Sequence, residues 1–87
     1  MEIKYYKQFA RNLKLRIKPN PGLFDRYKER TRLFITDSAN PILKDHGLKG
    51  EKEKFRAFSI TGDIRVIYYQ GKNYIYFIDI GTHEEVY

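Results

Sequence analysis

Apolar residues recur with a helical period near the start of the chain and with a strand-like period near its end. In the first segment the apolar side chains lie three or four positions apart, at Tyr6, Phe9, Ala10, Leu13 and Ile17. This spacing predicts an amphipathic helix whose other face is basic. A short strand-like stretch, residues 2–5, precedes it.

A second helix is expected to begin at Asn20-Pro21, because asparagine is a favoured N-cap and proline is tolerated at the first helical position. Its apolar stripe consists of Leu23, Phe24, Tyr27, Thr31, Phe34 and Ile35. The polar segment 37–41 ends in a proline and should end this helix. The short connection between the two helices predicts an antiparallel helical hairpin.

Three segments rich in β-branched and aromatic residues follow, at 55–60, 64–69 and 74–80. The separators 61–63 and 70–73 are short turns, so the three strands should form an antiparallel meander. A helical hairpin covering one face of that sheet gives a two-layer α+β domain with a small antiparallel sheet, in the order β-α-α-β-β-β. We expect a short strand or tail after the last strand, and a second face that is at least partly open.

The length of 87 residues predicts a single domain, residues 1–87, with too little interior for a large substrate cavity. The substrate should therefore be large and bind to an open groove. The chain has no cysteine, which excludes disulfides and thiolate metal clusters. It has no apolar run long enough for a membrane span and no secretory signal pattern, so we expect a cytoplasmic protein.

The net charge of +6 is distributed unevenly along the chain. Residues 1–32 hold ten Lys or Arg and three acidic residues, a balance of +7, whereas the remaining residues hold seven basic and eight acidic groups. A concentrated basic surface attracts polyanions, which predicts contact with nucleic acid or an acidic protein. The alternative is a solvated helical surface that serves solubility.

Three blocks in the second half of the chain carry a family resemblance. They are residues 43–50 (LKDHGLKG), residues 55–56 with 62–68 (FR and GDIRVIY), and residues 80–87 (IGTHEEVY). With the order of elements, these blocks resemble the RelE/ParE superfamily of toxins, closest to its YafQ-like branch. The resemblance covers essentially the whole chain. It implies an endoribonuclease that needs no metal or other cofactor, cleaves messenger RNA at or near the ribosome, and is inhibited by a partner antitoxin.

Cleaving RNA without a metal requires a base for the 2′-OH, donors for the phosphate oxygens and an acid for the leaving 5′-oxygen. The two histidines of the chain, His46 and His83, are the candidates for acid and base because an imidazole titrates near neutral pH. The resemblance favours His83 as the acid, but the sequence does not assign the two roles. By the resemblance, Asp63 orients an imidazole or the attacking hydroxyl. The alternatives are ordinary loop histidines and an aspartate that satisfies its own turn.

Arg65 is expected to contact phosphate, because its planar fork fits phosphate oxygens and it lies within an apolar strand. A structural ion pair, for instance with Asp79, is the alternative. Arg56 is a weaker candidate for the same contact. The remaining candidates for RNA contact are Lys49, Lys52, Ser59 and Tyr87. By the resemblance, the aromatic ring near the end of the chain stacks on a nucleotide.

Two positions depart from the YafQ-like pattern. Ser59 stands where those enzymes carry a further histidine, and Ile64 stands where they carry a tryptophan. Serine can donate a hydrogen bond to phosphate but does not exchange protons near neutrality. Two other functions therefore stay open: a ParE-like toxin that binds DNA gyrase, and a nucleic-acid-binding relative that has lost the chemistry. The presence of His46, Asp63 and His83 favours the nuclease.

Overall fold

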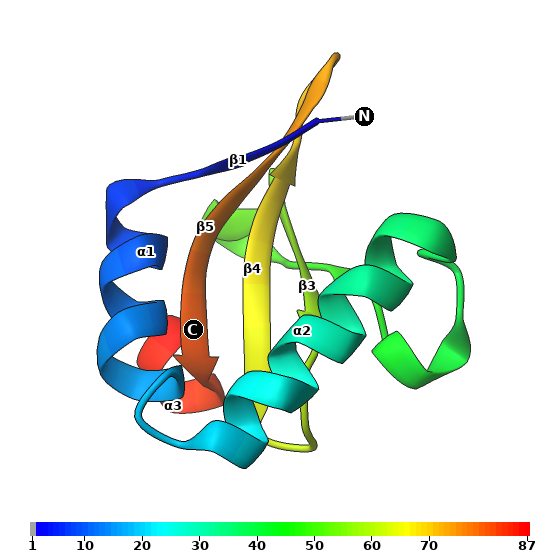
Figure 1. Cartoon of the computed structure of the whole chain (residues 1–87). Coiled ribbons are helices and arrows are strands. Elements are labelled where there is room, and N and C mark those ends of the chain that lie inside the picture. Colours follow the sequence, from blue (N-terminus) through cyan, green and yellow to red (C-terminus); the bar gives the residue numbers. More distant parts are fainter. Residues whose placement is uncertain (1) are drawn as a thin grey trace.

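A mixed five-stranded sheet forms the centre of the molecule (Figure 1). The computed structural model describes residues 2–87. The strands are β1 (Glu2–Tyr5), β2 (His46–Gly47), β3 (Phe55–Ser59), β4 (Ile64–Gln70) and β5 (Tyr74–Thr82), in the spatial order β1-β5-β4-β3-β2. As predicted, β3, β4 and β5 form an antiparallel meander. The sheet is nevertheless mixed, because β1 lies parallel to β5 with Ile3 opposite Ile75.

Two helical segments lie between β1 and the meander. The first begins as α1 (Lys7–Asn12) and continues as a π-helical turn, η1 (Leu13–Ile17). The second is α2 (Pro21–Thr36), which runs back across one face of the sheet (Figure 1). Its predicted cap is confirmed, since the Asn20 side chain accepts a hydrogen bond from the Leu23 backbone N–H at 3.2 Å.

The apolar stripe of α2 is correct except at its last member. Phe34 is buried, whereas Ile35 is 61 % exposed. Consecutive helical residues point about 100° apart, so both side chains cannot face the sheet at this end of the helix. Ile35 instead lines a shallow groove beside β1 and β4.

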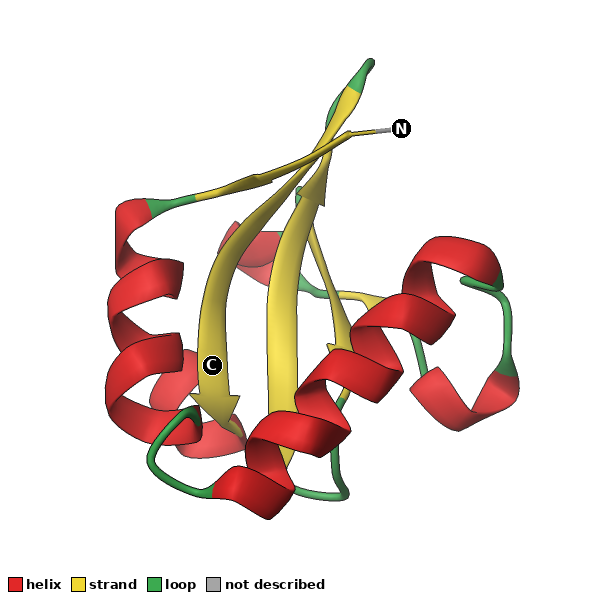
Figure 2. Cartoon of the chain, viewed as in Figure 1, coloured by secondary structure: helices red, strands yellow, loops and turns green. Residues whose placement is uncertain are grey.

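Short helical turns complete the structure: η2 (Pro41–Leu43), η3 (Gly50–Lys52) and α3 (His83–Val86) (Figure 2). Where we expected a strand or tail, residues after Thr82 form α3, because Thr82 caps a helix at that point. None of the helices within residues 2–87 is long and apolar enough to cross a membrane.

The main core lies between α2 and the sheet and consists largely of aromatic rings. Phe34 stacks on Phe58 with ring centroids 4.4 Å apart, and Phe77 meets Phe9 edge-on at 5.2 Å. The two-layer α+β architecture is thereby confirmed. On the opposite face a smaller cluster of Ala57, Ile67 and Val86 attaches α3 to the sheet. α3 therefore covers part of that face.

Candidate active site

Tyr87 contacts both histidines of the chain, His46 and His83. Its hydroxyl lies 3.3 Å from Nε2 of His46, and its ring meets the His83 imidazole edge-on with centroids 4.2 Å apart. All three side chains are exposed. The structure thus brings both predicted acid–base residues to one tyrosine, although 36 residues separate them in the sequence.

His46 is oriented by the backbone. Its Nδ1 lies 2.8 Å from the carbonyl oxygen of Lys44, a residue with a left-handed backbone (φ 49°). A carbonyl can only accept, so Nδ1 carries a proton in this contact. In the neutral imidazole, Nε2 then has a free lone pair and accepts from the Tyr87 hydroxyl.

His83 is placed by the start of α3. The Thr82 side chain accepts from the Glu85 backbone N–H at 3.2 Å, and a Glu85 carboxylate oxygen accepts from the Thr82 backbone N–H at 2.7 Å. This reciprocal arrangement is a capping box, which fixes where a helix begins. His83 is the first residue after the cap, so its position depends on this local geometry.

Arg65 lies beside Tyr87 and forms a hydrogen bond with it. Partial burial raises the pKa of the Tyr87 hydroxyl, and the charge and hydrogen bond of Arg65 act in the opposite direction. Arg65 also donates to the carbonyl oxygen of Gly62 at 3.3 Å. The suggested ion pair with Asp79 is not formed, because Asp79 accepts from Gln8 and Asn12 of α1 instead.

A groove of about 350 Å³ lies next to the histidine pair and is lined by residues 46–49, Lys52 and Tyr87. Lys52 lines this groove and also makes hydrogen bonds to the backbone. Its ammonium donates to the carbonyl oxygens of Val86 and Tyr87, at 3.0 and 3.1 Å. Lys49 lies in the same groove and is exposed.

Three residues that were predicted to belong to the site lie outside the group formed by the histidines, Tyr87 and the groove beside them. Asp63 is exposed in the β3–β4 turn, where its backbone N–H bonds to the Thr61 hydroxyl. Ser59 pairs with Arg65 across the strands but is buried and borders a different groove. Arg56 pairs with Tyr68 and points to the face that carries α2.

Arg56 belongs to a polar cluster with Asp45 and Tyr68, which no local pattern in the sequence indicates. The hydroxyl of buried Tyr68 donates to both carboxylate oxygens of Asp45 at 2.8 and 2.7 Å, and Arg56 Nε lies 3.3 Å from the same carboxylate. Burial raises the pKa of Tyr68, and the hydrogen bond from the arginine to the Tyr68 hydroxyl raises that of Arg56. Such a cluster was not foreseeable, because Asp45 comes from a loop distant in sequence.

Within residues 2–87, no three His, Asp or Glu side chains are grouped so that they could hold a metal ion. The side chains that the structure brings together at the site carry imidazole, phenol, ammonium and guanidinium groups. These groups suit proton transfer and the binding of anions.

Solved structures share this fold over nearly their whole length. Crystalline YafQ from E. coli strain BL21(DE3) is 24 % identical with a TM-score of 0.84, and covers 99 % of this chain and 97 % of its own. The E. coli DinJ–YafQ complex gives 25 %, 0.82 and the same two coverages. A metal-bound toxin from Helicobacter pylori is 29 % identical, with a TM-score of 0.79 and coverages of 100 % and 99 %.

The fold is therefore that of YafQ and of the YoeB/ParE toxin from Agrobacterium tumefaciens, which is the toxin fold that the resemblance implied. The family model for the bacterial toxin of type II toxin–antitoxin systems, YafQ, matches residues 1–87, and the chain belongs to this family. No curated protein compared with the chain matches it.

Proposed function

We propose that this toxin is an endoribonuclease that cleaves messenger RNA by acid–base catalysis, without a metal ion or other cofactor. The proposal rests on the Tyr87 junction, by which we mean the contacts of Tyr87 with both His46 and His83. These contacts place the two imidazoles beside one exposed groove. Two imidazoles near one point can take a proton from the 2′-OH and give one to the leaving oxygen.

The contact between His46 and Lys44 supports a direction for these roles. With Nδ1 donating to a carbonyl, neutral His46 presents a basic Nε2 toward the site. His46 is therefore the proposed base, and the Tyr87 hydroxyl, which donates to Nε2, orients the imidazole until the 2′-OH of the RNA takes its place. His83 is then the proposed acid.

Positive side chains around the junction suit the phosphate of an RNA. Arg65 lies next to Tyr87, and its Nε is buried without a hydrogen-bond partner among the described residues. Because this nitrogen is buried, a phosphate contact would fall to the other guanidinium donors, which suit phosphate oxygens. Lys49 and Lys52 line the groove beside it and add positive charge along the proposed RNA path.

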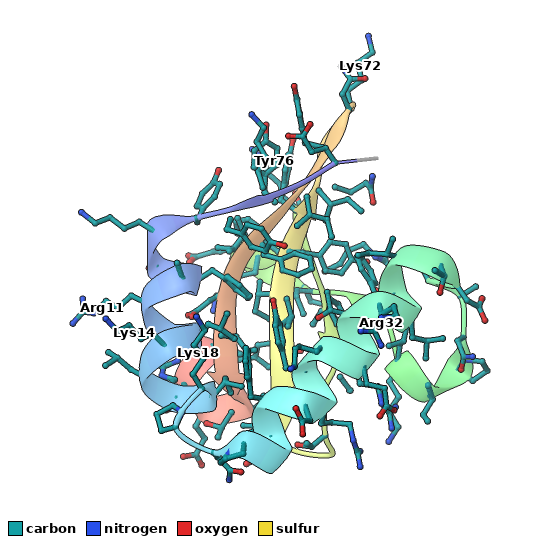
Figure 3. The ribbon with its side chains drawn as sticks, in the orientation of Figure 1. Arg11, Lys14, Lys18, Arg32, Lys72 and Tyr76 are labelled. Carbon is teal, nitrogen blue, oxygen red and sulfur yellow. The ribbon has the colours of Figure 1, made fainter. Side chains whose placement is uncertain are left out.

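Two macromolecular partners belong to this proposal. One is an antitoxin, supported by the structure of the related toxin in the E. coli DinJ–YafQ complex. The other is the ribosome, whose RNA would meet the basic helical segment. Arg11 and Lys14 are exposed and project from α1 and η1 (Figure 3). Either partner would be attracted by the +7 balance of the first 32 residues.

The test is expression of wild-type protein, His46→Ala and His83→Ala in bacteria, with growth and messenger-RNA integrity as readouts. We expect wild-type protein to arrest growth and fragment messages, and both variants to lose these effects while keeping the wild-type melting temperature. Lys72→Ala, in the distant β4–β5 hairpin, is the control and should remain toxic.

Two other results would contradict the nuclease. Arrest with intact messages and inhibited gyrase, unchanged in His83→Ala, would assign a gyrase-binding toxin. No arrest and no cleavage of purified or ribosome-bound RNA by the wild type would assign a relative that has lost the chemistry.

A further inference from the structure

Helix α3 carries His83 at its start and leads directly into Tyr87, yet it has four residues. One turn of helix is not stable by itself in water, because the cost of forming the first turn exceeds what a few hydrogen bonds return. Contacts from elsewhere in the chain must therefore hold α3 in place. The residues that supply them determine where the proposed acid lies.

We infer that Arg16 is a positioning residue for this site, fixing α3 through Glu85 so that His83 and Tyr87 stay next to His46. The inference rests on the proposed function for its catalytic meaning, and on the geometry for the positioning itself. Arg16 lies in the π-helical turn η1, 67 residues before His83.

The guanidinium of Arg16 bridges β5 and α3. Its Nε lies 3.3 Å from a carboxylate oxygen of Glu85, and its Nη1 donates to the Ile80 carbonyl oxygen at 3.0 Å. Nη1 also lies 3.9 Å from the carboxylate of buried Asp79. Arg16 thus contacts the strand just before α3 and the helix itself.

Glu85 connects this bridge to the helix cap. One of its carboxylate oxygens accepts from the Thr82 backbone, and the other faces Arg16. The hydrogen bond from the Thr82 backbone lowers the pKa of Glu85, and the charge of Arg16 lowers it further. Glu85 therefore remains ionised near neutral pH, and its carboxylate takes part in the capping box and in the contact with Arg16 at the same time.

Gly81 leaves the space that this arrangement needs. A Cβ at this position would lie 2.5 Å from Nη1 of Arg16 and 2.9 Å from a Glu85 carboxylate oxygen. Any side chain here would displace one of those two groups. The Gly81-Thr82-His83 sequence thus has a physical explanation: room for Arg16, then a cap, then the imidazole.

The expected effect on stability is small, whereas the expected effect on catalysis is large. The side chains of Arg16 and Glu85 are 29 % and 39 % exposed, and partly exposed ion pairs stabilise little. A displacement of a catalytic group by about 1 Å, however, can lower a rate by up to about 100-fold. Activity and local geometry are therefore the informative readouts.

The experiment compares Arg16→Gln and Glu85→Gln with wild type, measuring RNA cleavage at saturating and limiting RNA together with NMR of the imidazole protons. Glu85→Gln is the sharper variant, because glutamine keeps the capping box but loses the charge that faces Arg16. We expect kcat to fall about tenfold in each variant with KM within about twofold. The double variant should be no worse than either single variant, and Arg16→Lys should restore part of kcat.

NMR provides a readout that does not depend on nuclease activity. The Tyr87 ring, 4.2 Å from the imidazole, should shift the His83 proton resonances in wild type, and this shift should decrease in both glutamine variants. Lys72→Gln removes the same charge in a distant hairpin and should change neither kcat nor the His83 resonances.

Unchanged His83 resonances and unchanged kcat in both variants would overturn the inference. A rise in KM with constant kcat would instead show that Arg16 serves RNA binding. Should wild-type protein fail to cleave RNA, the proposed function fails, while the NMR comparison still decides whether Arg16 positions His83.

Discussion

The hydroxyl of Tyr87 lies 3.3 Å from Nε2 of His46, so the aromatic residue predicted to stack on a nucleotide also contacts an imidazole. The tyrosine therefore has contacts within the protein besides the nucleotide contact that was predicted for it. It orients His46 through its hydroxyl while its ring packs against His83.

Tyr87→Phe separates these two roles, because it removes the hydroxyl and keeps the ring. We expect cleavage at saturating RNA to fall about tenfold, since His46 loses the group that orients Nε2. The free energy of unfolding should change by less than about 0.5 kcal/mol, because the hydroxyl is near the surface. Single-turnover cleavage and urea unfolding measure the two effects. Tyr76→Phe, in the hairpin away from the site, is the matched control (Figure 3).

Lys52 and Lys49 allow a second test, because both line the groove but only Lys52 donates to the carbonyl oxygens at the end of α3. A cation at this end of a helix is stabilising. Lys52→Ala should lower both the melting temperature and kcat, whereas Lys49→Ala should raise KM and weaken its salt dependence. Identical kinetic changes in the two variants would mean that Lys52 is simply a phosphate contact.

Phe77 occupies the centre of the aromatic core, where its ring meets those of Phe9, Phe34 and Phe58. Phe77→Ala should cost about 3–5 kcal/mol of unfolding free energy, because it leaves a cavity that packed rings cannot fill. For a domain of this size, that loss can be most of the stability. Ile35→Ala should cost under about 0.5 kcal/mol, since Ile35 is exposed. Urea titrations of both variants check this difference.

Stability should decrease in alkaline solution because of Tyr27. Burial raises the pKa of this phenol to about 12, from an ordinary value of 10.0. The folded state thus favours the neutral form, so its contribution is complete below pH 10 and is lost as the pH rises from 10 towards 12. The loss from this group is at most about 2–3 kcal/mol. Urea midpoints at pH 8 and 11 should differ less in Tyr27→Phe than in wild type; an equal difference would contradict the assignment.

Gly81→Ala should disturb the region around Arg16, since the added methyl group meets both Arg16 and Glu85. We expect a loss of about 1 kcal/mol, at the low end for overpacking because the nearest atoms are the ends of two flexible side chains, together with a lower cleavage rate. Gly62→Ala is the control for stability, because nothing lies within 4 Å of the added Cβ. Thermal unfolding of the two variants distinguishes a specific clash from a general effect of replacing glycine.

Local signals in the sequence were sufficient for most of the fold. Asn20 and Pro21 indicate the start of α2 because capping involves neighbouring residues, and alternating side chains indicate the meander. The parallel pairing of Ile3 with Ile75 was not predictable, because strand register across 72 residues leaves no local pattern.

In the candidate site, too, residue types could be predicted from the sequence, but contacts between residues far apart in the sequence could not. His46, His83 and Tyr87 could be named from residue type and family blocks, and the structure brings them together. The contacts of Arg16 and Lys52 with α3 join residues far apart in sequence, and charged side chains on a basic chain have many possible partners. These contacts can be identified only from the three-dimensional structure, which shows where α3 lies.

The parallel pairing of β1 with β5 also has a consequence for synthesis. β1 leaves the ribosome about seventy residues before its partner residues 74–77, and α3 follows after them. A growing chain therefore cannot complete its sheet or join its two histidines before translation has passed these last segments. While residues 2–73 are being translated, the ribosome that makes this toxin therefore carries a chain in which the candidate site is not yet assembled.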